Sequence, residues 1–216
     1  MKPSLIVCAT AVLLCTSFCG STLAQSSVLR EADQRYRLQK AVADAEAKGS
    51  DAANFIVIAP GVVKDKRTGL EWMRCSMGQD WSEIKKTCEG SLDKYKFRDA
   101  RDVASKLNNF GGFQGKTDWR LPTVRELQSL RTCSTGFSLV PADIQDGGSA
   151  VPIFCNEGSA PPTFAQTVFP RTAADGSYWT ASPYVGDTRF AWVVSFYDGY
   201  VKYDFPTSRA YVRLVR

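Results

Sequence analysis

The stretch from Thr117 to Thr123 (TDWRLPT) constrains the fold most, because it combines a turn, a large aromatic residue and a helix start. Pro122 disfavours helical geometry at the residue before it, and Thr123 followed by Glu126 has the spacing of a capping box. Apolar residues at positions 124, 127 and 130 give the next segment one apolar helical face. We therefore predict a short helix that begins at Thr123 and packs over a buried Trp119.

Two charged residues, Asp118 and Arg120, flank that tryptophan. Buried polar groups in proteins nearly always have hydrogen-bond partners. We therefore interpret Asp118 and Arg120 as a structural pair, or as side chains bonded to the backbone, rather than as catalytic groups.

The first 24 residues have the pattern of a secretory signal peptide. Their apolar run, from Leu5 to Leu14, is far shorter than the roughly 20 residues that cross a bilayer. Phe18 puts a bulky side chain where a lipoprotein signal needs a small one, which argues against lipidation of Cys19. We expect an exported protein in the periplasm, at the cell surface or outside the cell, without a transmembrane segment.

Cysteine count and compartment predict two disulfides. Four cysteines follow the signal peptide, namely Cys75, Cys88, Cys133 and Cys155. Of the three possible pairings, we favour Cys75 with Cys88 and Cys133 with Cys155, because each closes a loop within one segment. A zinc site is disfavoured, since the chain has no Cys-x-x-Cys pair and no histidine.

The absence of histidine also limits catalysis. It excludes histidine general bases and nucleophiles that histidine activates. A carboxylate pair such as Asp143 and Asp146 suits glycosidase chemistry only at a defined separation, which the sequence does not fix. We expect no enzymatic activity.

Two segments follow the signal peptide. Residues 28–48 lack glycine and proline and carry a thin apolar stripe, so we predict a helical stalk over 25–53, with 28–48 as a candidate for homo-oligomer contacts. Residues 54–216 then form one domain. Strands at 55–58, 62–63 and 70–74 should pair through turns at Pro60-Gly61 and 65–69.

A second amphipathic helix is predicted from Tyr95 to Asn108. Its charges suit an ordinary solvated face, in which Arg98 and Asp102 have ion-pair spacing. They also suit a polyanion site. The candidate ligand-binding residues are Lys94, Lys96, Arg98, Arg101 and Lys106.

The segment from Cys133 to Pro170 is long and has little regular structure, which is typical of a functional loop. Residues 138–188 hold one basic residue and five acidic ones, so we expect an acidic loop beside a more basic remainder. The acidic residues suit Ca²⁺, but their spacing matches no known calcium loop, so we assign no metal and no cofactor.

The end of the chain is predicted to be sheet, with strands at 178–182, 190–197, 200–205 and 211–215. Asp198-Gly199 is a two-residue hairpin signal. Both faces of the 190–197 segment are apolar, which favours a central strand. Trp179, Tyr184 or Tyr200 exposed beside a cleft would favour contact with a sugar.

Several motifs occur in a fixed order. They are 63–72 (VKDKRTGLEW), 117–123 with Glu126-Leu127, Phe169-Pro170, 178–184 (YWTASPY), Ala191-Trp192 and 212–216 (VRLVR). Together, from about Val62 to Arg216, they resemble the Lcl C-terminal domain family, which is named after a bacterial collagen-like adhesin. The resemblance implies an α+β, C-type-lectin-like domain with mainly antiparallel sheet, two helices and a long disulfide-stapled loop. Its structural motif residues are Trp72, Asp118, Trp119, Arg120, Pro122, Trp179, Trp192 and Arg213.

The same resemblance implies an exported binding or adhesion module for a sulfated or other anionic polysaccharide, or for a surface protein. The alternative is a structural or accessory subunit of a bacterial envelope or pilus-like assembly. The chain lacks collagen-like repeats and the Glu-Pro-Asn and Trp-Asn-Asp motifs of calcium-dependent lectins, so calcium-mediated sugar binding is not expected. No specific nucleic-acid partner is expected.

We predict that the exported protein begins at Gln25, because small residues precede this position and end the signal peptide. Intact-mass measurement of the exported protein tests the cleavage site. A lipid-modified Cys19 at the N-terminus would contradict the prediction.

Overall fold

The computed structural model describes residues 52–140, 151–184, 187 and 189–216, and five residues near the N-terminus. The chain divides into two units, Met1–Gln39 and Lys40–Arg216, and the second contains every element discussed below. The five N-terminal residues, all helical, are Arg30, Asp33, Gln34, Tyr36 and Arg37. The predicted signal peptide, and the predicted stalk apart from these five residues and the last two at 52–53, lie outside the described residues.

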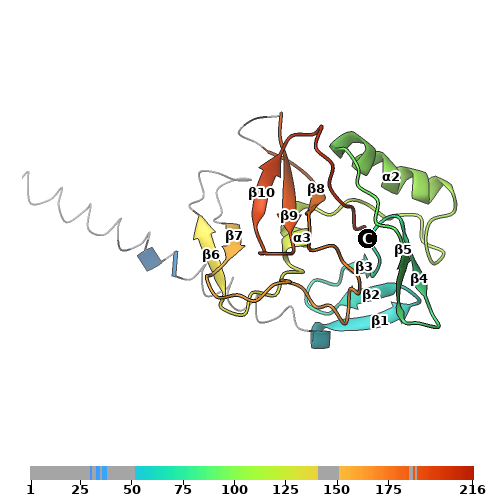
Figure 1. Ribbon diagram of the computed structural model, residues 1–216, viewed down its shortest axis with the longest axis horizontal. Helices are drawn as coiled ribbons and strands as arrows, with labels where there is room; N and C mark the ends of the chain where they lie inside the picture. The colour runs from blue at the N-terminus through green and yellow to red at the C-terminus, as the bar shows by residue number, and fades with distance from the viewer. Residues whose placement is uncertain are drawn as a thin grey trace, which may run out of the picture. The chain divides into compact units, whose positions relative to one another are not determined.

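The first part of the domain forms two small antiparallel sheets (Figure 1). After a 3-10 turn at Ala52–Asn54, strands β1 (Phe55–Ala59), β2 (Val62–Asp65) and β3 (Glu71–Met73) pair in that order, as predicted. Strands β4 (Gln79–Ser82) and β5 (Thr87–Gly90) form a hairpin, and the Cys75–Cys88 disulfide joins β5 to the segment after β3.

Both predicted domain helices are present. Helix α2 spans Phe97–Asn109 and buries Ala100 and Ala104. Helix α3 spans Val124–Gln128, and Thr123 and Glu126 form the predicted capping box, with each side chain bonded to the other residue's backbone N–H. Trp119 is buried and donates its indole N–H to a backbone oxygen.

The second half of the domain is mainly antiparallel sheet. Strands β6 (Phe137–Val140) and β7 (Val151–Cys155) form a hairpin that the Cys133–Cys155 disulfide closes, which confirms the second predicted pairing. Strands β8 (Ser177–Pro183), β9 (Ala191–Ser195) and β10 (Val201–Asp204) form a three-stranded sheet with β9 in the centre, as predicted. The turn around Gly199 is longer than the predicted two residues, since 196–200 lie between the strands.

The β8–β9–β10 sheet separates two hydrophobic clusters. Trp179 and Val193 belong to the cluster that contains the buried residues of α2, and the Phe97 ring lies 5.3 Å from the Trp179 ring. Tyr178 and Trp192 belong to the cluster that contains the buried face of α3. Residues that alternate along β8 and β9 therefore fill two cores, because successive side chains of a strand point to opposite faces.

The prediction of a final strand at 211–215 was wrong about its continuity. This segment is not a continuous strand: it pairs briefly with several parts of the chain. Val215 pairs with Trp72 and with Arg120, Tyr211 with Tyr178, and Ala210 with Tyr95. Residues 210–215 are all buried, and Figure 1 marks the C-terminus close to β3, with which this segment pairs.

Arg213 lies inside this segment and is 1% exposed. Its guanidinium donates to the backbone oxygens of Met73 and Arg74 and to the hydroxyls of Ser76 and Thr172. The guanidinium carbon also lies 4.8 Å from the centre of the Phe169 ring. Burial lowers the pKa of Arg213, and no carboxylate of the described residues forms an ion pair with it.

Replacing Arg213 by methionine should lower the free energy of unfolding by roughly 3 kcal/mol, because buried carbonyl oxygens lose their donors while the apolar stem is kept. The matched control is Arg125→Met on the exposed face of α3, where a change within about 0.5 kcal/mol is expected. Urea denaturation measures both values. Equal unfolding midpoints for the two variants would contradict the structural role of Arg213.

Candidate functional site

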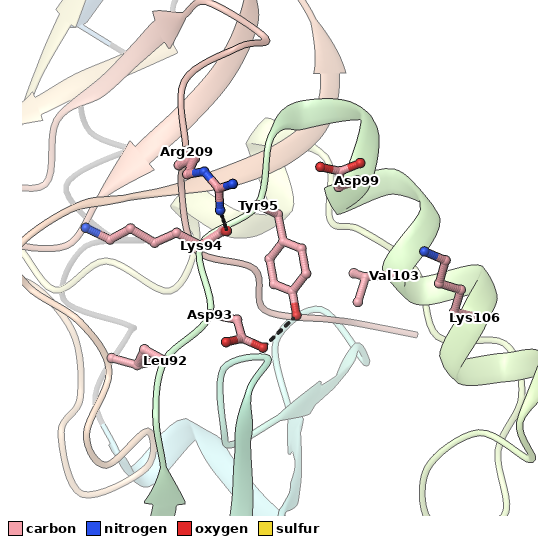
Figure 2. A pocket seen from close by; sticks show the side chains of 8 residues that line it. All are labelled: Leu92, Asp93, Lys94, Tyr95, Asp99, Val103, Lys106 and Arg209. Atoms are coloured by element: carbon pink, nitrogen blue, oxygen red, sulfur yellow. Dashed lines mark hydrogen bonds between the residues drawn. The ribbon is translucent and has the colours of Figure 1, made fainter.

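A pocket of about 790 Å³ lies beside α2. Its walls come from the segment that leads into the helix, from one flank of the helix, and from Arg209, just before the buried C-terminal segment (Figure 2). The lining residues are Leu92, Asp93, Lys94, Tyr95, Asp99, Val103, Lys106 and Arg209.

Tyr95 is the central side chain of this pocket (Figure 2). Its backbone exchanges two hydrogen bonds with Ala210, and its carbonyl oxygen accepts a 2.7 Å bond from the indole of Trp179. Its hydroxyl donates to Asp93 over 3.1 Å. Burial, and then the charge of Asp93, raise the pKa of Tyr95 to about 12, so the phenol stays neutral and is a hydrogen-bond donor at neutral pH.

Lys94 contributes its backbone to the pocket wall, and its amine points away from Tyr95, toward Tyr211. Arg209 donates to the Lys94 carbonyl oxygen over 3.2 Å. The Lys94 ammonium lies 4.6 Å from the centre of the Tyr211 ring, and Figure 2 shows its side chain extending away from Tyr95. This cation therefore lies on the opposite side of the segment from the α2 flank.

The other four predicted ligand-binding residues are exposed but do not form one cluster. At about 100° per helical residue, Arg98 and Arg101 lie about 60° apart on one flank of α2. Lys106 lies about 20° from Asp99, on the flank that faces Tyr95 (Figure 2). Lys96 is the N-cap residue of the helix. Arg98 and Arg101 thus share one flank of the first turns, Lys96 lies at the start of the helix, and Lys94 and Lys106 are separated from these three.

Several surface cations of the domain form ion pairs, but the candidate cations around α2 do not. Among the described residues, the salt bridges of the domain use Arg67, Lys85, Lys86, Arg120, Arg189 and Arg216. The five candidate cations form none with a described acid, and the expected pair between Arg98 and Asp102 is not formed. The α2 region therefore presents cations whose charge no described carboxylate neutralises by direct contact.

Asp118 and Arg120 are structural residues, but they do not pair with each other. Arg120 forms two 2.7 Å bonds to Glu126, which also receives the Thr123 backbone N–H, and these contacts hold the pKa of Glu126 below its usual range. Asp118 accepts a 2.7 Å bond from Arg216. The pairing prediction was therefore wrong about the partners, which lie on α3 and at the C-terminus.

The remaining motif residues belong to the core. Trp72, Trp119, Trp179 and Trp192 are all buried. Pro122 is buried as well, and its carbonyl oxygen accepts a 2.6 Å bond from the backbone of Ala181. These residues hold the domain together and line neither the α2 pocket nor the second pocket described next.

A second pocket, of about 560 Å³, lies at one end of the β8–β9–β10 sheet. Its lining residues are Ala174, Asp175, Gly176, Ser177, Ser195, Tyr197, Asp198, Tyr200 and Lys202. Of the three aromatic residues proposed for sugar contact, Trp179 is fully buried, Tyr184 is half-buried, and Tyr200 is exposed in this pocket. The other lining residues were missed because they come from two separate segments, 174–177 and 195–202. The tyrosines on both sides of Asp198-Gly199 are the one sequence signal that points to this pocket.

Within the described ranges, no three acidic or cysteine side chains come together as a metal site, and no helix is long and apolar enough to cross a membrane. Asp143 and Asp146, the carboxylate pair considered above, lie outside those ranges.

Comparison with known proteins gives one family assignment. The family model of the Lcl C-terminal domain matches residues 61–216, which include α2, α3, both disulfides and the buried C-terminal segment. A search of curated proteins finds no match. Because the family model matches well over half of the chain, this protein belongs to the Lcl C-terminal domain family.

Proposed function

We propose that this protein is an exported adhesion-type module with a C-type-lectin-like domain that binds an anionic polysaccharide through the first turns of α2. The family assignment is consistent with an adhesion-type module. Two disulfides suit an oxidising compartment outside the cytoplasm. The observation that carries the proposal is the set of exposed cations, Lys96, Arg98 and Arg101, that no described acid pairs with.

The expected binding is weak and depends on salt. Asp99 and Asp102 lie on the same helix and dilute the positive potential. Exposed charges interact over about 10 Å at 0.1 M salt, so a polymer must lie directly along the helix to gain from these cations. Such contacts favour a polymer with closely spaced anionic groups over a single small anion.

Removing three cations from α2 should weaken retention on heparin. Exposed ion pairs are each worth about 0.5 kcal/mol, so the triple variant Lys96→Ala, Arg98→Ala, Arg101→Ala should bind roughly tenfold more weakly. The measurement is the salt concentration at which each protein elutes from a heparin column.

A control variant that loses the same number of positive charges at other positions shows whether retention depends on the α2 cations or only on the net charge of the protein. The variant Lys64→Ala, Lys66→Ala, Arg125→Ala removes three exposed cations elsewhere and should elute like the wild type. The variant Asp99→Asn, Asp102→Asn should elute later. Equal loss of retention in both triple variants would reject α2 as the site, and no retention of the wild type at low salt would reject polyanion binding.

One observation favours the alternative, a structural subunit. Strand β1 is an edge strand without a charged residue, and Ile56, Val57 and Ile58 are exposed by 49%, 62% and 44%. Exposed apolar edges pair readily with other chains. The occupant we propose is a second copy, paired β1 to β1 about a two-fold axis, with residues 28–48 as a further contact between the copies.

If copies pair through β1, Val57→Lys should convert a dimer to a monomer, because it adds a charge to the paired edge. The control is Ile84→Lys, since Ile84 is 96% exposed in the β4–β5 hairpin, away from β1. Light scattering coupled to size-exclusion chromatography gives the masses. A wild-type monomer at about 100 µM would exclude a dimer of useful affinity.

A further inference from the structure

The second pocket has a floor made by three strands. Ser177 and Ser195 are direct partners across β8 and β9, and the Ser195 backbone N–H donates to the Tyr200 carbonyl oxygen over 2.8 Å. Directly opposed residues of a sheet have side chains on the same face. The two serine side chains therefore lie side by side at this end of the sheet, and Tyr200 lines the same pocket.

Two tyrosines lie at this pocket with much of their surface uncovered. Tyr197 is 57% exposed and Tyr200 is 38% exposed. Another exposed tyrosine, Tyr203, is different, because its ring stacks 4.5 Å from that of Tyr184 and has a structural partner. Tyr197 has no ring partner among the described residues, and Tyr200 has only Phe154 at 6.2 Å.

The turn that carries the two tyrosines is held in place by a disulfide and a buried arginine. Gly199 has a φ of +70°, and a Cβ atom there would collide with Sγ of Cys155, so the turn packs directly on the Cys133–Cys155 disulfide. The buried Arg131 donates to the Gly199 carbonyl oxygen. Asp198 accepts the Tyr200 backbone N–H over 3.0 Å. A binding surface held in this way loses little conformational entropy when a ligand binds.

Polar groups converge on the same pocket. Asp175 accepts the Tyr211 hydroxyl over 3.0 Å through Oδ1, and Asp198 uses its Oδ1 for the turn. In the described part of the chain, the second oxygen of each carboxylate has no hydrogen bond that competes with a ligand. Two carboxylates against the single cation Lys202 make the lining acidic, which disfavours a sulfated or carboxylated ligand.

We infer that this pocket binds an uncharged saccharide unit. One apolar face of the sugar ring would lie on Tyr197 or Tyr200, and its hydroxyls would donate to Asp175 and Asp198 and exchange hydrogen bonds with Ser177 and Ser195. Small-ligand sites combine an apolar wall with a few convergent polar groups, and tyrosine supplies rigid contact area with a polar tip. This inference goes beyond the proposed polyanion function and does not depend on it, since the residues and the ligand charge differ.

The test is titration of the exported protein with four uncharged hexasaccharides, namely cellohexaose, laminarihexaose, maltohexaose and chitohexaose. Saturation-transfer NMR detects binding, and calorimetry gives the affinity. We expect at least one probe to bind with an affinity that is the same at low and high salt, because no ion pair forms. Tyr200→Ala and Tyr197→Ala should each weaken that probe about tenfold, as truncation of an aromatic contact residue typically does.

Two further variants test whether the loss of affinity is specific to the pocket and independent of misfolding. Tyr203→Ala, at an exposed tyrosine outside the pocket, should change the affinity less than twofold. Asp175→Asn keeps the shape of the pocket and should also weaken binding, which covers the case in which a tyrosine variant fails to fold. No binding of any probe at about 10 mM would overturn the inference, as would binding that survives both tyrosine variants. Loss of saccharide binding in the Lys96, Arg98 and Arg101 variant would place the sugar at the polyanion site instead.

Discussion

The structure depends on the burial of residues 210–215. Residues 210–216 pair with β3, with the segment before α2, with the Trp119 segment and with the start of β8, so one short segment joins four parts of the domain that are far apart in the sequence. Arg213 fixes its position through four hydrogen bonds to carbonyl and hydroxyl oxygens. A buried cation is costly unless it is fully hydrogen-bonded, so this arrangement selects one register for the segment.

This region also contacts residues that line both candidate pockets. Arg209, just before the buried segment, lines the first pocket, and Ala210 holds Tyr95 within it. Tyr211 lies between the two sites: its ring faces the Lys94 ammonium, and its hydroxyl donates to Asp175 of the second pocket. The two pockets are chemically different, and one buried tyrosine contacts a lining residue of each.

Features that depend on neighbouring residues were predictable from the sequence. The capping box at Thr123, the two local disulfides and the central strand β9 all follow from spacing within one segment. Contacts between distant segments were not predictable, because no local pattern encodes them. Asp118 pairs with Arg216, 98 positions away, and the buried Arg213 bonds to Met73 and Thr172, which are 140 and 41 positions away. The pockets were missed for the same reason, except for the basic residues of α2 and Tyr200, which the sequence did single out.

The central functional claim is that an anionic polysaccharide binds along the first turns of α2. The most direct test is nitrogen-15 NMR of the exported protein, titrated with a heparin-derived hexasaccharide at low salt. The account predicts that the largest amide shift changes occur at Lys96, Arg98 and Arg101, and that they reverse when salt is added. Shift changes concentrated on β2 and α3, or none at all, would contradict it.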